Sequence, residues 1–546
     1  MKRFVLVASL TALLVIALLW VFFPHGRNVT SRVVGQEELK KIEKELKPAG
    51  EDMEFTLTCQ GNELAYDSNT RTFFLPKCSE FKESKSFDFD SLRSNSTDFE
   101  VLFTKELVEL GVEKLRKDNT AIPFMVVKEG TYSWYNLKIT GVSTFSITGT
   151  ENSSPEGLPV YAVSLWDSEA VGNPVTTCFT TSRIHGNTSQ NYEKLSLRLN
   201  LLRQKKDGTF ESVNHNLLGI RDDNDWILNS LYADSSRMRD KLAIDLWSET
   251  GATDNPYGQH FGTKAEYVEV FINDSYQGLY LLMSPIDKKQ LGMDAVSDQM
   301  AAGSPVIERI YKKKYTAVWD SQDFVGPLPD PQTKDFRGGF FLKGDTILEN
   351  EEEWSPLYDL ASCMEADDQT FTKEITGLAD QNSVLDNWLY YQAIAGFDNS
   401  GKNFYYVTKN KNGRCYGYFI PWDMNLSFGD VYADNAFYSE NKPEVVTEEI
   451  PWEPAGRMLA LNVEDSAALA AQKWEEWRQG VFSDESMSER IDGLEQTITD
   501  SGAMAREMER WPSGNADPDT TGLREFTTKR LAYVNSLVAE YQHKPE

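Results

Sequence analysis

The stretch that decides the fold is DNSGKNFYYVTKNKNGRCYGYFIPWDMNLSFG, residues 398–429. It begins with Asp398, and Asn403 follows five residues later. Two β-rich runs flank a turn at 410–414, which predicts a strand–turn–strand unit. Asp423 comes directly after the second run. We therefore expect two carboxylates and an amide at the two open ends of a single hairpin.

These residue types suit phosphoryl transfer. One carboxylate orients or deprotonates the attacking hydroxyl, and an Asn and a second Asp hold Mg²⁺ on the phosphates. Protein kinases space the first Asp and the Asn as D-x-x-x-x-N and place the metal-binding Asp after a hairpin. Asp398, Asn403 and Asp423 have this order. The alternative is a β-hairpin whose Asp and Asn side chains only cap turns, because roughly one or two such spacings are expected by chance in this chain.

Composition excludes several classes of protein. The chain has 546 residues, of which 40% are hydrophobic, so it folds and has room for roughly two to four domains. Lys plus Arg is 55 and Asp plus Glu is 84, a net charge of −29. Such a charge repels nucleic acid and favours basic partners, although it also serves solubility. The five Cys and five His lack metal-finger spacing, so we expect no zinc site.

The N-terminus predicts a membrane anchor. Lys2 and Arg3 precede an unbroken apolar run at 4–23, which is long enough to span a bilayer as a helix. The residues after this run do not resemble a cleavage site, and the basic N-terminal side stays in the cytoplasm. We predict an uncleaved signal-anchor at 1–27, with the rest of the chain outside the cytoplasm. A cleaved secretory signal is the second interpretation and places the body on the same side.

The remaining chain divides into segments that differ in composition and in hydrophobic pattern. We expect a charged stalk at 28–50, containing a helix at 36–47, and a β-rich domain at 51–150. Within that domain, 101–117 has the spacing of an amphipathic helix. Cys59 and Cys78 flank a candidate hairpin and form either a disulfide or two thiols.

A catalytic domain is expected at 151–440 and a helical C-terminal lobe at 441–546. In this lobe, helical periodicity predicts helices at 467–479, 488–498, 503–510 and 523–540. An apolar helix at 384–395 leads into Asp398 and would support it rigidly. The segment 303–331 has the composition of a loop.

A second candidate for phosphate binding is SRIHGNTSQNYEK, residues 182–194. It is a polar loop with one glycine that ends at Lys194, just before a predicted strand. Backbone N–H groups and an ammonium are what a phosphate needs. The alternative is an ordinary hairpin loop, and a single glycine does not separate the two.

Several segments coincide with one known family. They occur in the family's order and are RIHGNTSQNYEKLSLRL, WILNSLYADSSRMRDKLA, VEVFINDSYQGLYLLMSPID, LDNWLYYQAIAGFDNSGKNFYYV and GYFIPWDMNLSFG. On these motifs the chain resembles the CotH family, the spore coat protein H-like atypical protein kinases. The resemblance covers roughly 176–431 and, more loosely, the helices through 541. It favours the phosphotransfer interpretation over the turn-capping alternative.

The resemblance implies a reduced protein-kinase-like α+β fold that transfers the γ-phosphate of ATP to protein Ser or Thr. It makes Asp398 the catalytic-loop carboxylate, and Asp423 and Asn403 the ligands of Mg²⁺. Lys194 becomes the residue that binds the ATP phosphates. Asp234 and Arg239 match a D-x-x-x-x-R element that we interpret as a structural helix cap.

Three positions depart from the family pattern. His185 stands where the family usually has Arg, and Ser284 where members often carry Glu. Asn425 replaces the second Asp of W-D-x-D. If the missing Glu holds the nucleotide or the Lys, its loss weakens ATP binding, and Asn425 removes one possible metal charge.

The favoured hypothesis is therefore a Mg²⁺/ATP-dependent protein Ser/Thr kinase at the outer side of the membrane. Its protein substrate is expected to be basic and Ser-rich, and no nucleic acid is expected as a partner. The alternative is a non-catalytic pseudokinase or adhesin-like surface protein on the same scaffold. A third possibility is a carbohydrate-active protein that uses Asp398 and Asp423 as paired carboxylates. The Asn at kinase spacing argues against the third.

Overall fold

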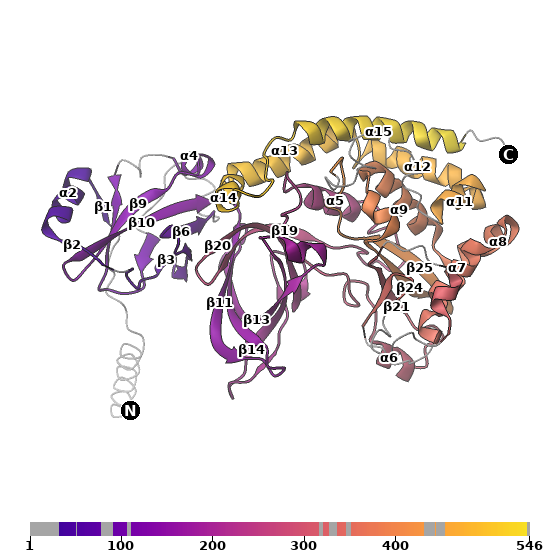
Figure 1. The fold of residues 1–546 in the computed structure, drawn as a ribbon, viewed down its shortest axis with the longest axis horizontal. Coiled ribbons are helices and arrows are strands. Elements are labelled where there is room, and N and C mark those ends of the chain that lie inside the picture. Colours follow the sequence, from indigo (N-terminus) through magenta and orange to yellow (C-terminus); the bar gives the residue numbers. More distant parts are fainter. Residues whose placement is uncertain are drawn as a thin grey trace, which may run out of the picture.

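The structure is a computed structural model with mixed α+β architecture. Figure 1 shows a β-rich N-terminal domain, a closed sheet beside it and, beyond that, a second sheet surrounded by helices. The described residues are 32–50, 52–77, 91–105, 111–315, 320–326, 336–344, 351–430, 443 and 454–542. The predicted anchor at 1–27 lies outside them. Among the helices in these ranges, none combines the length and apolar character needed to cross a bilayer.

The N-terminal domain is built on a mixed sheet with strand order β1-β8-β9-β10-β6-β5, and β2 pairs with β10. These strands are β1 (Arg32–Val34), β2 (Lys47–Pro48), β5 (Ala65–Asp67), β6 (Thr72–Pro76), β8 (Glu100–Thr104), β9 (Ile122–Lys128) and β10 (Thr131–Thr140). A small sheet adds β3 (Leu57–Cys59), β4 (Asn62–Glu63) and β7 (Leu92–Ser94). The core is aromatic, and Phe124 stacks on Tyr135 with ring centroids 5.9 Å apart. Cys78 lies outside the described residues, so the choice between a disulfide with Cys59 and two thiols stays open.

The charged helix expected in a stalk is part of this domain. Helix α2 (Gln36–Glu45) buries Leu39 in an apolar cluster with Val34, Leu102 and Met125 of the sheet. One apolar stripe on an otherwise charged helix is enough to fix it to a sheet face.

The helix predicted at 101–117 is wrong over its first residues. Strand β8 occupies Glu100–Thr104, because its backbone pairs with β1 on one side and β9 on the other. Helix α4 covers only Val112–Lys117. Strand pairing thus overrides a local helical pattern that was real but weak.

The closed sheet follows. Its strands run β13-β12-β11-β19-β20-β18-β14-β15, and β14 pairs back with β13, which closes the ring. They are β11 (Ser143–Ser153), β12 (Pro159–Trp166), β13 (Val175–His185), β14 (Ser196–Gln204), β15 (Phe210–Ser212), β18 (Asp225–Asn229), β19 (Ala265–Ile272) and β20 (Tyr276–Met283). Inward side chains such as Phe145, Leu199 and Val268 fill the ring. Because β11 pairs with β19, this unit begins near Ser143, earlier than the boundary expected at 150.

The second sheet has the antiparallel order β22-β23-β21-β24-β25. Its strands are β21 (Arg309–Lys313), β22 (Phe336–Arg337), β23 (Phe340–Lys343), β24 (Phe404–Lys411) and β25 (Arg414–Pro421). Strand β21 was missed, since 303–331 was predicted to be a loop. Alternation divides its side chains: Tyr311 is buried in the main core, whereas Lys312 faces the other way.

Helices surround this sheet (Figure 1). They are α5 (Arg239–Ser248), α6 (Val296–Ala301), α7 (Ser355–Glu365), α8 (Asp368–Leu378), α9 (Gln381–Ile394) and α10 (Phe397–Gly401). Of these helices, α8 and α9 pack on β25. The C-terminal set is α11 (Ala455–Ala460), α12 (Ser466–Gln479), α13 (Asp484–Asp500), α14 (Ala503–Arg510) and α15 (Thr521–Gln542). The C-terminal helices match the predicted ones closely. In Figure 1, α13 and α15 lie across the top of the molecule, and α9 is enclosed between β25 and the C-terminal helices.

Candidate functional site

The hairpin predicted around the turn at 410–414 is present. Strands β24 and β25 pair from Phe404 opposite Pro421 to Lys411 opposite Arg414. At the open end, the Trp422 N–H donates to the carbonyl of Asn403 at 2.9 Å. Helix α9 is buried on all sides and ends just before α10, which carries Asp398. The short linkage between rigid elements fixes Asp398 against the hairpin.

Three of the predicted site residues come together here. Asn403 Nδ2 donates to Asp398 Oδ2 at 2.8 Å, and Asp423 lines the same cavity as both. Asn403 and Asp423 each have a φ of 58°, in the left-handed region that non-glycine residues rarely adopt. Buried Asn399 holds both ends of the hairpin, because its Nδ2 donates to the carbonyls of Asn403 (3.0 Å) and Trp422 (2.8 Å).

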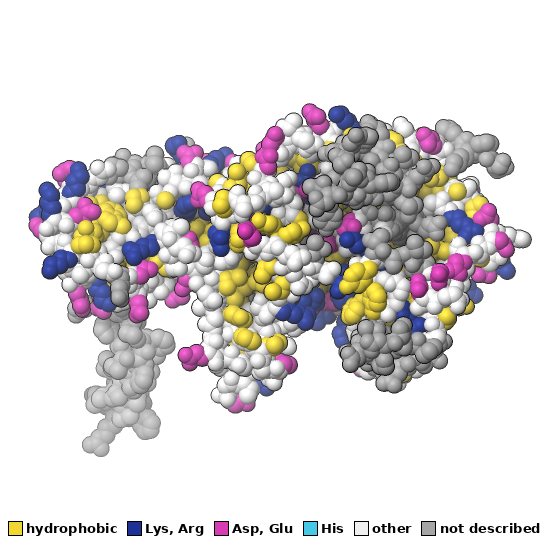
Figure 2. Space-filling view, in the orientation of Figure 1, with side chains coloured by type: hydrophobic (Ala, Val, Ile, Leu, Met, Phe, Trp, Pro, Cys, Tyr) yellow, Lys and Arg dark blue, Asp and Glu magenta, His cyan; other side chains and the backbone are white. Residues whose placement is uncertain are grey.

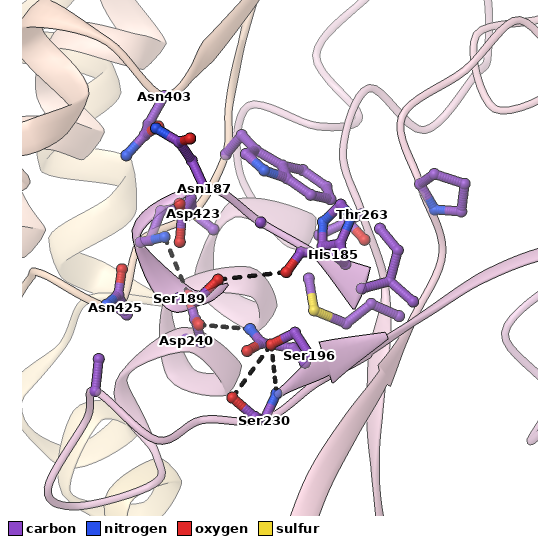
Figure 3. Close-up of a pocket in the computed structure, with 18 of the residues that line it drawn as sticks. His185, Asn187, Ser189, Ser196, Ser230, Asp240, Thr263, Asn403, Asp423 and Asn425 are labelled. Carbon is purple, nitrogen blue, oxygen red and sulfur yellow. Dashed lines mark hydrogen bonds between the residues drawn. The ribbon is translucent and has the colours of Figure 1, made fainter. Parts of the chain in front are cut away.

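Asp398, Asn403 and Asp423 line a cavity of about 410 Å³ between the closed sheet and the second sheet. Figure 3 shows Asn403, Asp423 and Asn425 along one side, with His185 and Thr263 on the other. The floor includes apolar side chains such as Ile227 and Met283. A cavity of this size with convergent polar groups fits a small molecule rather than water alone.

Cations are concentrated at this cavity in a chain that is otherwise strongly acidic. Figure 2 shows Lys and Arg side chains gathered between the two sheets. The cations that line the cavity are Arg183, Arg198, Lys312, Lys314, Lys343 and Lys402. Arg198 is paired with Asp225, and Lys402 lies 3.1 Å from Asp398.

Lys312 and Lys343 differ from Arg198 and Lys402, because no carboxylate among the described residues forms an ion pair with either lysine. The Lys312 ammonium lies over the rings of Trp422 (5.1 Å) and Tyr405 (5.6 Å). Lys343 Nζ donates to the Ile286 carbonyl at 2.7 Å. Both lie on the same face of the second sheet, because Lys312 stands opposite Phe341 in β23, two residues from Lys343. Two ammonium groups on one cavity wall without carboxylate partners suit an anionic ligand.

Burial shifts the pKa of the groups around the cavity. It lowers the pKa of Lys343 to about 7, with Arg198 and Lys312 adding to the effect. It lowers the pKa of Lys312 to about 8, although Asp423 opposes this. Burial also raises the pKa of Asp398 and of Asp423, and the nearby ammonium groups of Lys402 and Lys312 respectively oppose these shifts. An anion bound at the lysines would stabilise their charged form, and a cation bound at the carboxylates would stabilise theirs. Each ion would therefore offset the pKa shifts that burial causes.

Lys194, the predicted phosphate ligand, does not join the others. Its side chain is buried, and its Nζ donates to Glu507 of α14 at 2.8 and 2.9 Å and to the Leu279 carbonyl at 2.6 Å. The ammonium also lies 4.4 Å from the Tyr280 ring centroid. All three of its donors are therefore used inside the protein, and Lys312 and Lys343 occupy the place we expected for it.

Asp234 and Arg239 form the structural cap that the sequence predicted. Asp234 accepts hydrogen bonds from the Arg239 N–H and the Arg239 guanidinium, both at 2.7 Å. Asp240, the next residue of α5, was not predicted and lines the cavity with 2% of its surface exposed. Burial and the neighbouring Asp423 raise the pKa of Asp240 to about 8.

The three departures from the family pattern occupy different surroundings. His185 ends β13 at the cavity, and burial among cations lowers its pKa to about 3, so its imidazole is neutral. Ser284 is buried and its Oγ accepts from the Lys264 N–H at 3.1 Å. Asn425 lines the cavity two residues after Asp423.

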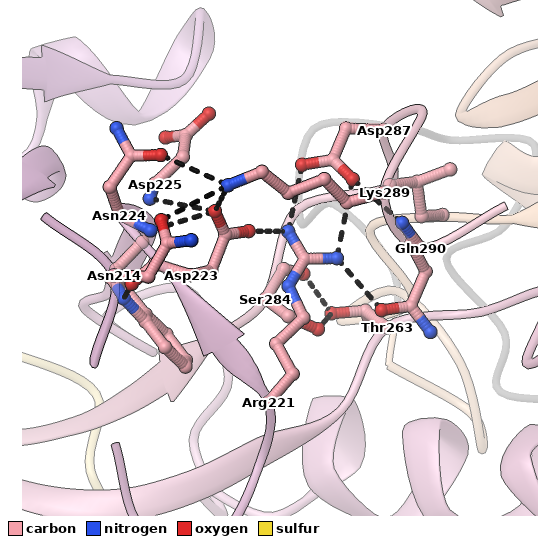
Figure 4. Close-up of polar contacts among 12 residues, drawn as sticks. Asn214, Arg221, Asp223, Asn224, Asp225, Thr263, Ser284, Asp287, Lys289 and Gln290 are labelled. Carbon is pink, nitrogen blue, oxygen red and sulfur yellow. Dashed lines mark hydrogen bonds and ion pairs between the residues drawn. The ribbon is translucent and has the colours of Figure 1, made fainter. Parts of the chain in front are cut away.

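A polar network holds the segment 284–308, which joins the two sheets. Arg221 donates to Asp287 at 2.7 Å and pairs with Asp223, and Lys289 donates to Asp223 at 2.5 Å, as Figure 4 shows. On the other side, Lys343 donates to the carbonyl of Ile286 in the same segment. The network therefore ties the segment to the closed sheet while Lys343 ties it to the second sheet, which fixes the spacing across the cavity.

Fold and site together define a mixed α+β protein with a polar cavity, lined by carboxylates and cations, between two sheets. The family model described as CotH kinase protein matches residues 182–534, so the chain belongs to the CotH family. The match spans the closed sheet from the end of β13, the second sheet and the C-terminal helices through most of α15. No curated protein matches the chain.

Proposed function

We propose that this protein is a Mg²⁺/ATP-dependent protein Ser/Thr kinase with a reduced kinase-like fold. The observation that carries the proposal is the convergence of Asp398, Asn403 and Asp423 on a cavity that also holds Lys312 and Lys343. Carboxylates and an amide suit a divalent cation, and ammonium groups without carboxylate partners suit phosphate oxygens. The family match supports the same chemistry.

The residues present fit a magnesium ion. Asn403 uses its amide nitrogen to donate to Asp398, which leaves its oxygen for a cation. Asp423 lines the cavity and supplies a carboxylate. Mg²⁺ takes few protein ligands and keeps waters and phosphate oxygens, so two protein ligands are enough. When bound, the ion would neutralise charge on the transferring phosphoryl group.

The chain's own residues then position the reactants. Asp398 is held by Asn403 and by Lys402, so its carboxylate is fixed and still has lone pairs to accept the substrate hydroxyl. Its raised pKa lets it take the proton more readily than an exposed carboxylate would. Lys312 and Lys343 bind the phosphates in place of Lys194. The substrate is a protein hydroxyl, and the net charge of −29 favours a basic, Ser-rich segment.

The test is transfer of labelled phosphate from ATP to a mixed Ser/Thr peptide substrate. Asp398→Ala should lower the rate by about 10²- to 10⁴-fold, the usual contribution of a positioned base. Asp423→Ala should abolish metal-dependent nucleotide binding. Asp207→Ala is the matched control, because Asp207 is exposed on a turn of the closed sheet. Equal incorporation by all of these variants and the native chain would refute the proposal.

The second candidate is a non-catalytic pseudokinase or surface-binding protein. It is favoured by Asn425, which lines the cavity where the family has a second Asp. Thermal unfolding with Mg-ATP separates the two functions. A nucleotide-dependent rise in melting temperature supports the kinase, and no rise supports the binding protein.

We also propose that residues 1–27 anchor the protein in the membrane with its body outside the cytoplasm. The support is the apolar run at 4–23 behind Lys2 and Arg3. Protease added to intact cells should digest the body of the protein, and protection from it would contradict this orientation.

A further inference from the structure

Asp240 connects helix α5 to the loop that carries Asp423. Its Oδ1 accepts from the Met424 N–H at 3.0 Å, and its Oδ2 accepts from Asn229 Nδ2 at 2.9 Å. Asn229 ends β18 of the closed sheet, so the carboxylate links three elements around the cavity. Figure 3 shows Asp240 in the middle of the cavity residues, on the same side as Asp423 and Asn425.

This carboxylate is not used to cap its own helix. Asp234 already accepts from the first N–H of α5, and the hydrogen bonds that Asp240 makes within the described part of the chain both leave the helix. A carboxylate buried to 2% exposure is costly unless it is hydrogen-bonded. Its hydrogen bonds therefore indicate a role in the loop that carries Asp423.

The loop needs such support. Asp423 has a φ of 58°, a conformation that persists in a non-glycine residue only when its surroundings impose it. The two peptide groups that flank Asp423 are each held by a buried side chain. Asn399 donates to the Trp422 carbonyl at 2.8 Å on one side, and Asp240 accepts from the Met424 N–H on the other.

We propose that Asp240 is a positioning residue that aims the Asp423 carboxylate at the metal by holding the peptide between Asp423 and Met424. The inference rests on the proposed function, because it assigns Asp423 to the metal. It goes further in stating that the acceptor geometry of Asp240, and not its charge, sets the metal affinity.

The experiment measures Mn²⁺ binding by electron paramagnetic resonance in the presence of a non-hydrolysable ATP analogue. Asp240→Asn keeps an oxygen acceptor for the Met424 N–H and cannot ionise, whereas Asp240→Glu keeps an ionisable carboxyl group and moves the acceptor. We expect the Asp240→Asn variant to bind Mn²⁺ nearly as tightly as the native chain does. The Asp240→Glu variant should bind it about 10- to 100-fold more weakly. Asp240→Ala, which removes the acceptor, should behave as Glu and replaces it if the longer side chain prevents folding.

The opposite ranking of Mn²⁺ affinities, with weak binding by Asp240→Asn and near-native binding by Asp240→Glu, would overturn the proposal. Asp240 would then act on the metal through its charge. Native affinity in all three variants would also overturn it while leaving the kinase proposal in place. A native chain that binds neither Mn²⁺ nor the analogue would instead refute the proposed function itself. Thermal unfolding of each variant shows whether weak binding follows from loss of fold.

Discussion

Binding of a Mg-nucleotide should be accompanied by uptake of protons. Lys312 and Lys343 lie in the cavity without a carboxylate ion-pair partner among the described residues, and burial lowers the pKa of both. Phosphate oxygens favour the charged form of an ammonium, so binding should raise both pKa values again. At pH 8 the nucleotide phosphates are already fully ionised, because their last pKa is about 6. Protons released or taken up on binding at pH 8 therefore come from groups of the protein and not from the nucleotide.

The size of the effect follows from the two pKa values. With a pKa of about 7, Lys343 is about 10% protonated at pH 8 and should take up about 0.9 proton when phosphate restores its charge. With a pKa of about 8, Lys312 is about half protonated and should take up about 0.5 proton. The two lysines together account for an uptake of about 1.4 protons at pH 8 and only about 0.1 at pH 6, where both are already charged. Nucleotide affinity should fall as pH rises through this range.

Isothermal titration calorimetry in buffers of different ionisation enthalpy measures this uptake directly. Lys343→Met should remove about 0.9 of the protons at pH 8, and Lys205→Met, on an exposed turn, should remove none. Tight binding at pH 8 with no proton uptake would refute the reasoning. So would uptake that is unchanged in Lys343→Met, because the protons would then come from elsewhere.

Three further outcomes are expected. Glu507→Gln should lower the free energy of unfolding by about 3–5 kcal/mol in urea denaturation, because it leaves Lys194 and Arg237 buried without their shared carboxylate; a loss under 1 kcal/mol would contradict this. Asn425→Asp should tighten Mn²⁺ binding, since it adds a carboxylate at the cavity, and unchanged affinity would show that this side chain does not face the metal. Deletion of residues 1–27 should move the protein from the membrane pellet to the supernatant, and a deletion variant that still sediments with membranes would exclude the anchor.

Local patterns predicted much of the fold. The hairpin around the turn at 410–414, the apolar helix before Asp398 and the C-terminal helices all occur close to their expected bounds. Each has a strong periodicity or turn signal within a single stretch of chain. The predictions that failed lie where pairing with distant strands decides the structure. Strand β21 at Arg309–Lys313 was expected to be a loop because it lies in the segment 303–331, which has the composition of a loop. Pairing with β23 and β24 makes it a strand.

The sequence by itself determined which residues stand at the ends of the hairpin, because the order of Asp398, Asn403 and Asp423 around a turn is a property of one continuous stretch. Only the tertiary structure decided which lysines face the cavity. Lys194 pairs with Glu507, a residue 313 positions away, whereas Lys312 and Lys343 line the cavity. The physical reason is that the state of a buried ammonium depends on the charges around it, and folding chooses those charges from anywhere in the chain.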